Sequence, residues 1–174
     1  MNNLRARIKE KRKQLSDESL NLLGNDILKN VQASISFEDR ERISTYFSMN
    51  NEVDTSELNN YLWGINKHLF LPKIKQDKLL FSSYSKDQKL SLNDYGIPEP
   101  EHNNEKLIQA EQFDLMFIPL VTFDSKCNRI GMGGGYYDKT LAFKKESEKK
   151  SKPLLIGLAY ELSLIHISEP TRPY

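Results

Sequence analysis

The sequence has few residues that could build a disulfide or a zinc site. Cys127 is its single cysteine, so no intramolecular disulfide can form, which fits a reducing compartment. The three histidines, His68, His102 and His166, are scattered and show no zinc-ligand spacing. Cys127 also has no histidine near it in the sequence, which weighs against a nucleophilic thiol. We therefore expect neither a disulfide-stabilised domain nor a zinc protein.

Long hydrophobic runs and an excess of charge of one sign are also missing. No stretch approaches the roughly 20 apolar residues that span a bilayer, and the N-terminus lacks the apolar segment of a secretory signal. The 25 Lys and Arg residues against 24 Asp and Glu give a net charge of +1, whereas nucleic-acid binders normally have a strong basic excess. We expect a cytoplasmic monomer with no membrane or nucleic-acid partner.

The pattern of apolar residues predicts the secondary structure. Helical spacing predicts helices over residues 4–15 and 16–31, the second capped by Ser16, and a third that starts at Asp54. The basic residues of the first helix are expected to form mainly a solvated face, with one or two reaching an anionic ligand. The other expected elements are strands at 42–48, 68–71 (ended by Pro72), 79–84, 114–119 and 154–159, a loop at 93–100 and a helix at 139–150.

Helices that alternate with short buried strands indicate an α/β fold. We expect one domain with three layers (α/β/α) around a mostly parallel sheet, spanning residues 1–162. The last twelve residues read SLIHISEPTRPY, with two prolines and no periodicity. This segment resembles a translated sequencing-adapter fragment, so residues 163–174 are expected to be a non-native tail.

The segment at 128–138, NRIGMGGGYYD, has the residues needed to bind phosphate. Four glycines in five positions let backbone N–H groups converge on an anion without Cβ atoms in the way. Arg129 can add a bidentate contact to phosphate, and Asp138 can supply an oxygen to Mg²⁺. Tyr136 and Tyr137 offer aromatic faces and hydroxyls to a flat heterocycle. The glycines alone would predict only a connector; the flanking side chains favour a binding loop.

Known phosphate-binding fingerprints do not describe this loop. No Gly-Lys-Ser/Thr follows the glycines, so it is not a P-loop, and the spacing is not G-x-G-x-x-G. The segment at 114–141, DLMFIPLVTFDSKCNRIGMGGGYYDKTL, instead resembles the signature of the 5-formyltetrahydrofolate cyclo-ligase (5,10-methenyltetrahydrofolate synthetase) family. Leu4-Arg5, the segment from Phe47 to Glu52, Pro72-Lys73 and the GIPEP sequence follow in the family's order.

The resemblance implies an enzyme of one-carbon folate metabolism. It implies that ATP and Mg²⁺ drive the cyclisation of 5-formyltetrahydrofolate to 5,10-methenyltetrahydrofolate through a phosphorylated formyl group. Implied ATP contacts are Arg5, Arg129, Ile130, Gly131, Met132, Gly133, Gly134, Gly135, Tyr136 and Tyr137, with Arg129 and Tyr137 catalytic. The implied folate contacts are Phe47, Glu52, Met132, Gly133, Gly134, Gly135 and Tyr136, and the implied metal ligand is Asp138.

Some positions depart from the family's pattern and leave alternatives open. Leu120 stands where a glycine is usual, and a further acidic metal ligand beyond residues 154–159 is expected to be absent. One alternative is therefore a catalytically silent folate- or nucleotide-binding protein of the same fold, and another is a Rossmann-type dinucleotide binder. From the residues alone, Glu52 fits a solvated position after a strand, and Phe47 fits the core nearly as well.

Overall fold

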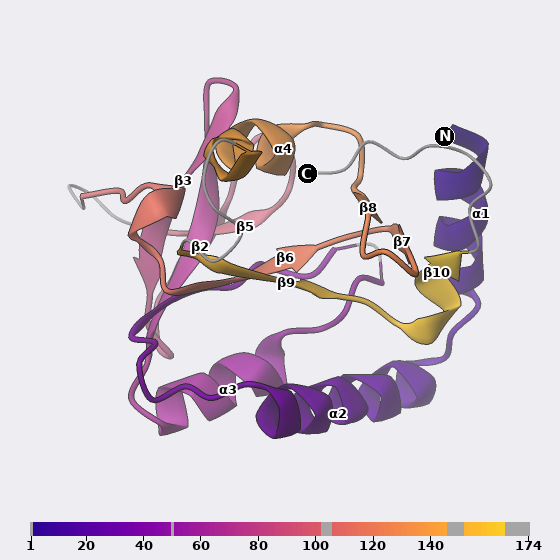
Figure 1. Cartoon of the computed structure of the whole chain (residues 1–174), viewed down its shortest axis with the longest axis horizontal. Helices are drawn as coiled ribbons and strands as arrows, with labels where there is room; N and C mark the ends of the chain where they lie inside the picture. The colour runs from indigo at the N-terminus through magenta and orange to yellow at the C-terminus, as the bar shows by residue number, and fades with distance from the viewer. Residues whose placement is uncertain (1, 50, 102–105, 146–151, 166–174) are drawn as a thin grey trace.

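A five-stranded sheet forms the centre of the computed structural model, which describes residues 2–49, 51–101, 106–145 and 152–165 (Figure 1). The strand order is β3-β2-β1-β6-β9. The three pairings among β2, β1, β6 and β9 are parallel, whereas β3 runs antiparallel to β2, which confirms the predicted mostly parallel sheet. These strands are β1 (Arg42–Ser44), β2 (His68–Lys75), β3 (Lys78–Tyr84), β6 (Leu115–Pro119) and β9 (Leu154–Leu158).

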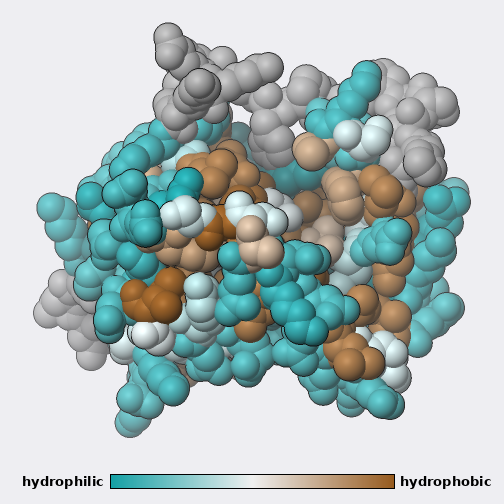
Figure 2. Space-filling model, turned by 60° about the horizontal axis from the view of Figure 1, so that its bottom comes forward, coloured by the Kyte–Doolittle hydropathy of each residue, from teal (hydrophilic) through white to brown (hydrophobic). Residues whose placement is uncertain are grey.

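Helices cover both faces of this sheet, as the predicted α/β/α layering requires. Helices α2 and α3 lie on one face and α4 lies on the other (Figure 1). An apolar cluster around Phe117 and Leu62 fills the first interface, and one around Phe113 and Phe81 fills the second. The outer face of the α2–α3 layer is largely hydrophilic, with apolar side chains surfacing between polar ones (Figure 2). The helices are α1 (Asn2–Lys13), α2 (Asp17–Ser34), α3 (Ser56–Gly64) and α4 (Tyr136–Thr140).

Two small sheets flank the central one. Strand β7 (Thr122–Asp124) pairs antiparallel with β8 (Arg129–Ile130), and α1 packs on this hairpin through Ile8 (Figure 1). Strands β4 (Leu90–Leu92) and β5 (Pro98–Pro100) form a hairpin. Its second strand lies in the segment 93–100 that was expected to be loop, so that expectation was wrong at residues 98–100. Asn93 closes its turn, because its Oδ1 accepts from the N–H groups of Tyr95 and Ile97.

Pro72 does not end its strand, contrary to the sequence prediction. Strand β2 continues to Lys75 and pairs Pro72 with Phe81 of β3. The N–H and C=O of Phe81 bond instead to Ile108, so they point away from β2. On the other side of β2, the β1 pairing stops at Phe70. The missing N–H of Pro72 therefore removes no ladder hydrogen bond, which is the condition under which a sheet tolerates proline.

The other element bounds were predicted to different extents. Ser16 caps α2 as expected, because its Oγ accepts from Ser19 N–H at 3.2 Å. Strand β1 stops at Ser44, and the Thr55 hydroxyl donates to Tyr46 O in the segment that follows. Helix α3 starts at Ser56, two residues after the predicted start. The predicted helix at 139–150 is shorter in its described part: α4 ends at Thr140 and a 3₁₀ turn (Ala142–Lys145) follows, while residues 146–150 lie outside the described residues.

The first residues after the predicted domain end pack into the fold. Ser163 is fully buried, and β10 (Leu164–Ile165) pairs in parallel with β7. Residues 166–174 lie outside the described residues, and the predicted boundary at residue 162 stays a prediction. Within the described part of the chain, no helix combines the length and hydrophobicity that a membrane span needs.

Candidate functional site

A cavity of about 480 Å³ opens where the carboxyl ends of β1 and β6 meet the glycine loop. Ligand sites in α/β sheets lie at this edge. Every residue predicted for the site lines the cavity except Ile130, whose side chain packs in the core against Ile8 and Val121. The cavity is lined by Arg5, Tyr46, Phe47, Met49, Glu52, Pro72, Ile74, Leu79, Asn93, Tyr95, Ile97, Glu99, Pro119, Arg129, Gly131 to Gly135, Tyr136, Tyr137 and Asp138.

The loop between β8 and α4 needs its glycines for two reasons. Gly133 and Gly135 have φ of 114° and 70°, a region that side-chain-bearing residues rarely adopt. At Gly131 and Gly134 the limit is space: a Cβ would lie 2.9 Å from Arg129 Nη1 and 3.0 Å from the Tyr136 ring, respectively. The loop therefore presents backbone, rather than side chains, to this part of the cavity.

Arg129 is held rigidly beside the loop. Its side chain is 6% exposed; Nη1 donates to Pro119 O at 3.1 Å, and Nη2 pairs with Asp138 Oδ1 at 3.0 Å. The guanidinium also lies over the Tyr137 ring, with Cζ 5.5 Å from the centroid. Burial lowers the pKa of Arg129, while Asp138 and Tyr137 raise it. An arginine stays charged under such conditions, so the loop has a fixed cation.

A second guanidinium reaches the same loop from the start of the chain. Arg5 Nε donates to Gly131 O at 2.9 Å, across 126 positions of sequence. Its head group also lies close to Gly133, 3.9 Å from where a Cβ would be. Two arginines and a glycine-rich backbone therefore converge on one wall of the cavity, an arrangement suited to phosphate oxygens.

Tyr137 and Asp138 complete this wall in different ways. The Tyr137 hydroxyl is buried and has no hydrogen-bond partner among the described residues. Burial raises the pKa of Tyr137 strongly, so the hydroxyl stays protonated and able to donate. Asp138 has a side chain 65% exposed. The described residues hold no group of three or more metal-ligating side chains, but Mg²⁺ needs only one or two carboxylates when phosphates and water supply the rest. Asp138 therefore fits as a Mg²⁺ ligand.

A buried carboxylate, Glu52, also lines the cavity. Glu52 is 8% exposed, and its Oε2 accepts from Met49 N–H at 3.1 Å. Burial raises the pKa of Glu52, and the Met49 hydrogen bond and the charges of Arg12 and Lys9 lower it. A buried carboxylate of this kind is a strong acceptor for the N–H groups of a heterocycle. The solvated position that the residues alone favoured for Glu52 is wrong.

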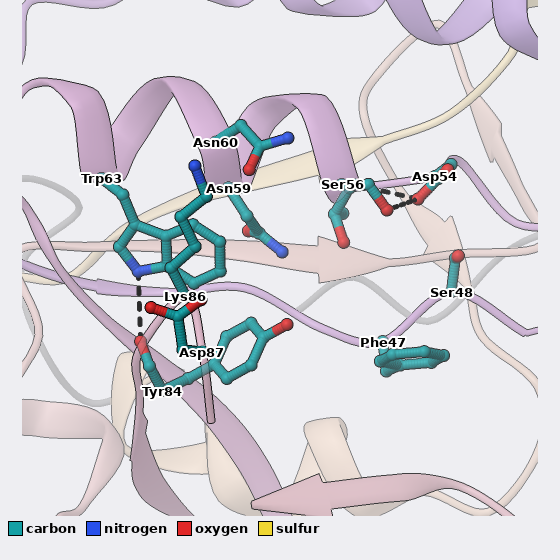
Figure 3. A pocket seen from close by; sticks show the side chains of 11 residues that line it. Phe47, Ser48, Asp54, Ser56, Asn59, Asn60, Trp63, Tyr84, Lys86 and Asp87 are labelled. Atoms are coloured by element: carbon teal, nitrogen blue, oxygen red, sulfur yellow. Dashed lines mark hydrogen bonds between the residues drawn. The ribbon is translucent and has the colours of Figure 1, made fainter. Parts of the chain in front are cut away.

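Phe47 lines both this cavity and a smaller one of about 290 Å³. Figure 3 shows the smaller cavity between α3, which carries Asn59 and Trp63, and the segment after β3, where Lys86 and Asp87 lie. Phe47 is 38% exposed, so it lines both cavities instead of belonging to the core.

Several lining residues were not predicted. Tyr95 lies in the β4–β5 turn, and its hydroxyl is 3.1 Å from that of Tyr136, so the pair bridges the hairpin and α4. Ile74 and Met49 add apolar surface. The turn-rich NDYGIPEP segment was the available signal for Tyr95, because ordered loops often carry function. No local pattern marks Ile74 or Met49.

The contact between Gly131 and Arg129 predicts a selective loss of function. In Gly131→Ala the new Cβ would displace the end of the Arg129 side chain, so we expect about a tenfold or larger loss of activity with little change in stability. Gly24→Ala is the matched control, since nothing lies within 4 Å of its Cβ position. That variant should keep full activity and gain about 0.5–1 kcal/mol of helix stability. Thermal melting and steady-state kinetics measure both effects, and equal activities of the two variants would contradict the geometry.

The fold and the site together define an α/β protein with a cavity whose arginines and glycine loop suit a phosphate-bearing ligand. The model of the 5-formyltetrahydrofolate cyclo-ligase family matches residues 1–173. The chain belongs to this family, which confirms the resemblance drawn from its motifs. The family consists of ligases, so the Rossmann-type dinucleotide-binding alternative is not supported.

Individual relatives agree with this assignment. The 5-formyltetrahydrofolate cyclo-ligase of Haemophilus influenzae is 38% identical over 124 residues, which are 70% of this chain and 64% of that protein. The Escherichia coli K12 enzyme of the same name is 28% identical over 161 residues, covering 91% of this chain and 86% of that protein. Among solved structures, the Aquifex aeolicus 5,10-methenyltetrahydrofolate synthetase aligns with a TM-score of 0.79 and 27% identity, covering 99% of this chain and 85% of that one.

Proposed function

We propose that the chain converts 5-formyltetrahydrofolate and MgATP into 5,10-methenyltetrahydrofolate, ADP and phosphate. The observation that carries this proposal is a single cavity that joins the two arginines and the glycine loop to Glu52 and Phe47. The first group suits the phosphates of ATP, and the second suits a pterin ring. The relatives named for this reaction support the same conclusion.

Each wall would do a different part of the work. Arg5, Arg129 and the backbone of residues 131–137 would hold the ATP phosphates, and Asp138 would bind Mg²⁺, which neutralises phosphate charge when bound. Glu52 would accept hydrogen bonds from the pterin, Phe47 would lie against its ring, and residues 132–136 would face the folate from the other side. Phosphoryl transfer depends mainly on positioning and on charge stabilisation, and fixed guanidinium groups supply both.

The reaction would proceed in two steps. The formyl oxygen attacks the γ-phosphorus, and the bond to the leaving oxygen of ADP breaks. Nitrogen 10 of the folate then attacks the activated formyl carbon and loses its proton, and the carbon–oxygen bond breaks to release phosphate. In the first step Arg129 would stabilise the charge on the transferring group, and the protonated Tyr137 beneath it would keep the guanidinium in place.

A spectroscopic turnover assay tests the proposal. Wild-type protein mixed with 5-formyltetrahydrofolate and MgATP should produce the near-ultraviolet absorbance of the methenyl product, and omission of ATP should abolish it. Binding of both ligands by calorimetry without any absorbance change would contradict the ligase and identify a silent binder. We also propose that the protein acts in the cytoplasm as a monomer; size-exclusion chromatography with light scattering tests the monomer.

A further inference from the structure

Arg12 is a buried cation in a helix whose neighbouring basic residues are exposed. Its side chain is 1% exposed, whereas Lys11 and Lys13 on either side face solvent. Arg12 follows Ile8 by four positions, so the two side chains share a helix face, and Ile8 is itself 1% exposed. The sequence prediction of a solvated basic face is therefore wrong at Arg12. A buried charge is destabilising unless it is well hydrogen-bonded, so its partners define what Arg12 does.

Among the described residues, the guanidinium of Arg12 bonds to neutral oxygens in two distant segments. Its Nη2 lies 2.9 Å from Leu120 O, 2.8 Å from Val121 O and 2.9 Å from Ser163 Oγ. Burial lowers the pKa of Arg12 and the charge of Glu52 raises it; the guanidinium stays charged. Arg12 therefore joins α1 to the turn between β6 and β7 and to the end of the described chain.

The β6–β7 turn is the same turn on which Arg129 rests. Arg129 Nη1 donates to Pro119 O, and the next two carbonyls, those of residues 120 and 121, accept from Arg12. Three consecutive carbonyls thus accept from two guanidinium groups. The Leu120 side chain, unusual for the family, fits because it lies over Gly157, where a Cβ would come within 2.7 Å of it. Arg12 therefore fixes the backbone that holds Arg129. Arg129 is the buried cation of what we call the phosphate wall, which consists of Arg5, Arg129 and the loop of residues 131–138.

Arg12 also reaches the turn that carries Glu52. Its backbone oxygen accepts from Asn51 Nδ2 at 2.9 Å, and Asn51 has a φ of 55°, which a non-glycine residue seldom adopts without support. The charges of Arg12 and Lys9 lower the pKa of Glu52. Among the described residues, the other ionisable groups around Glu52 are Tyr46 and Tyr137, whose pKa values its charge raises, and Tyr160, whose hydroxyl donates to Glu52 O.

We propose that Arg12 is a positioning residue that ties the turn seating Arg129 to the turn carrying Glu52. It thereby fixes the position of the phosphate wall relative to the proposed pterin contacts, Glu52 and Phe47. Arg12 does not line the cavity, so it acts through these two turns. Its guanidinium holds the turn that seats Arg129, whereas its backbone oxygen holds Asn51. A side-chain substitution therefore releases the first turn and removes a positive charge near Glu52, but keeps the Asn51 hydrogen bond. The kinetic readout of this proposal rests on the proposed ligase function, whereas its binding readout does not.

Three variants of the full chain test the proposal: Arg12→Met, Arg12→Lys and, as a matched control, Lys13→Met, whose side chain is 72% exposed. In Arg12→Met we expect kcat/KM for 5-formyltetrahydrofolate to fall about 100-fold, as for misplaced catalytic groups. The acid limb of its pH profile of kcat/KM should also move to higher pH, because the positive charge of Arg12, which lowers the pKa of Glu52, is gone. Arg12→Lys should keep the acid limb but lose about tenfold in kcat, since an ammonium lacks the planar fork. Lys13→Met should match the wild type.

Several results would overturn the proposal. If Arg12→Met is folded and its kcat/KM falls by the same factor at every pH, the role of Arg12 is purely structural. If its kcat/KM does not fall, Arg12 has no role in the reaction. If circular dichroism shows that Arg12→Met is unfolded, Arg12→Lys decides alone, and wild-type kcat in that variant rejects the proposal. If the wild type has no turnover, the ligase function fails independently. In that case, calorimetry measures the affinity for 5-formyltetrahydrofolate as a function of pH. A profile of Arg12→Met that is shifted to higher pH relative to the wild type supports the proposal, and an unchanged profile rejects it.

Discussion

Replacement of Arg129 by alanine is expected to lower kcat about 1,000-fold or more, the range found when an arginine that stabilises a transferring phosphoryl group is removed. Arg129 is the buried cation of the phosphate wall, held by Pro119 O, Asp138 and the Tyr137 ring. No solvent rearrangement is needed to bring it to the phosphate, which is why its contribution should be large. Binding of 5-formyltetrahydrofolate should change little, because the proposed pterin contacts are Glu52 and Phe47 and not Arg129.

The stability of Arg129→Ala should fall only modestly, because its ion-pair partner Asp138 is 65% exposed and can be solvated. Arg129→Lys keeps the charge but loses the two-pronged donor, so its kcat should lie between those of the alanine variant and the wild type. Arg7→Ala on the exposed face of α1 is the control for loss of one positive charge. Single-turnover kinetics measure the chemical step directly. Wild-type kcat in folded Arg129→Ala would remove Arg129 from the reaction.

Replacement of Glu52 by glutamine should weaken folate binding about 10- to 100-fold, since hydrogen bonds to a charged group contribute about 1.5–3 kcal/mol. Glutamine keeps the shape and the Oε atom that accepts from Met49 N–H, so the turn should stay intact. The KM for 5-formyltetrahydrofolate should rise and that for ATP should not. An unchanged folate KM would place the pterin elsewhere.

The pH dependence of this variant follows from the direction of the Glu52 pKa. Because burial raises the pKa of Glu52, the folded chain holds a proton on Glu52 at a higher pH than the unfolded chain does. Ionised Glu52 therefore destabilises the fold near neutral pH, and this penalty vanishes below the pKa of the unfolded chain. Glu52→Gln should melt at a higher temperature than the wild type at pH 7, and the gap should close in acid. Folate affinity of the wild type, unlike that of Glu52→Gln, should fall as the pH drops through the raised pKa.

Where its signals are local, the sequence predicted which residues lie together in the fold. The glycine run, Arg129 and Asp138 lie within eleven residues, and the loop brings them together. Arg5 and Glu52 came from the resemblance alone, because nothing local shows that α1 and the turn after β1 meet this loop. The structure supplies that link through Arg5 Nε and Gly131 O. The individual roles of these residues stay predictions until the variants are measured.

What was missed depends on tertiary contacts. Arg12 occupies the position at which the apolar stripe of Ile8 should continue, and this gap was the one available sign of a buried arginine. The strand through Pro72 could not be predicted, since tolerance of proline depends on which neighbour each edge of the strand has. Tyr95 reaches the cavity only because the β4–β5 hairpin folds back on α4.

Isotope transfer from the substrate tests the central claim most directly. We predict that 5-formyltetrahydrofolate labelled with oxygen-18 in its formyl group, incubated with MgATP and the wild-type protein, gives inorganic phosphate with one labelled oxygen per methenyl product formed. That result requires the γ-phosphoryl group and the formyl oxygen to meet in one cavity. Mass spectrometry of the phosphate gives the answer. Unlabelled phosphate accompanying methenyl formation would contradict the account, because the formyl oxygen would then have left without being bonded to the γ-phosphoryl group.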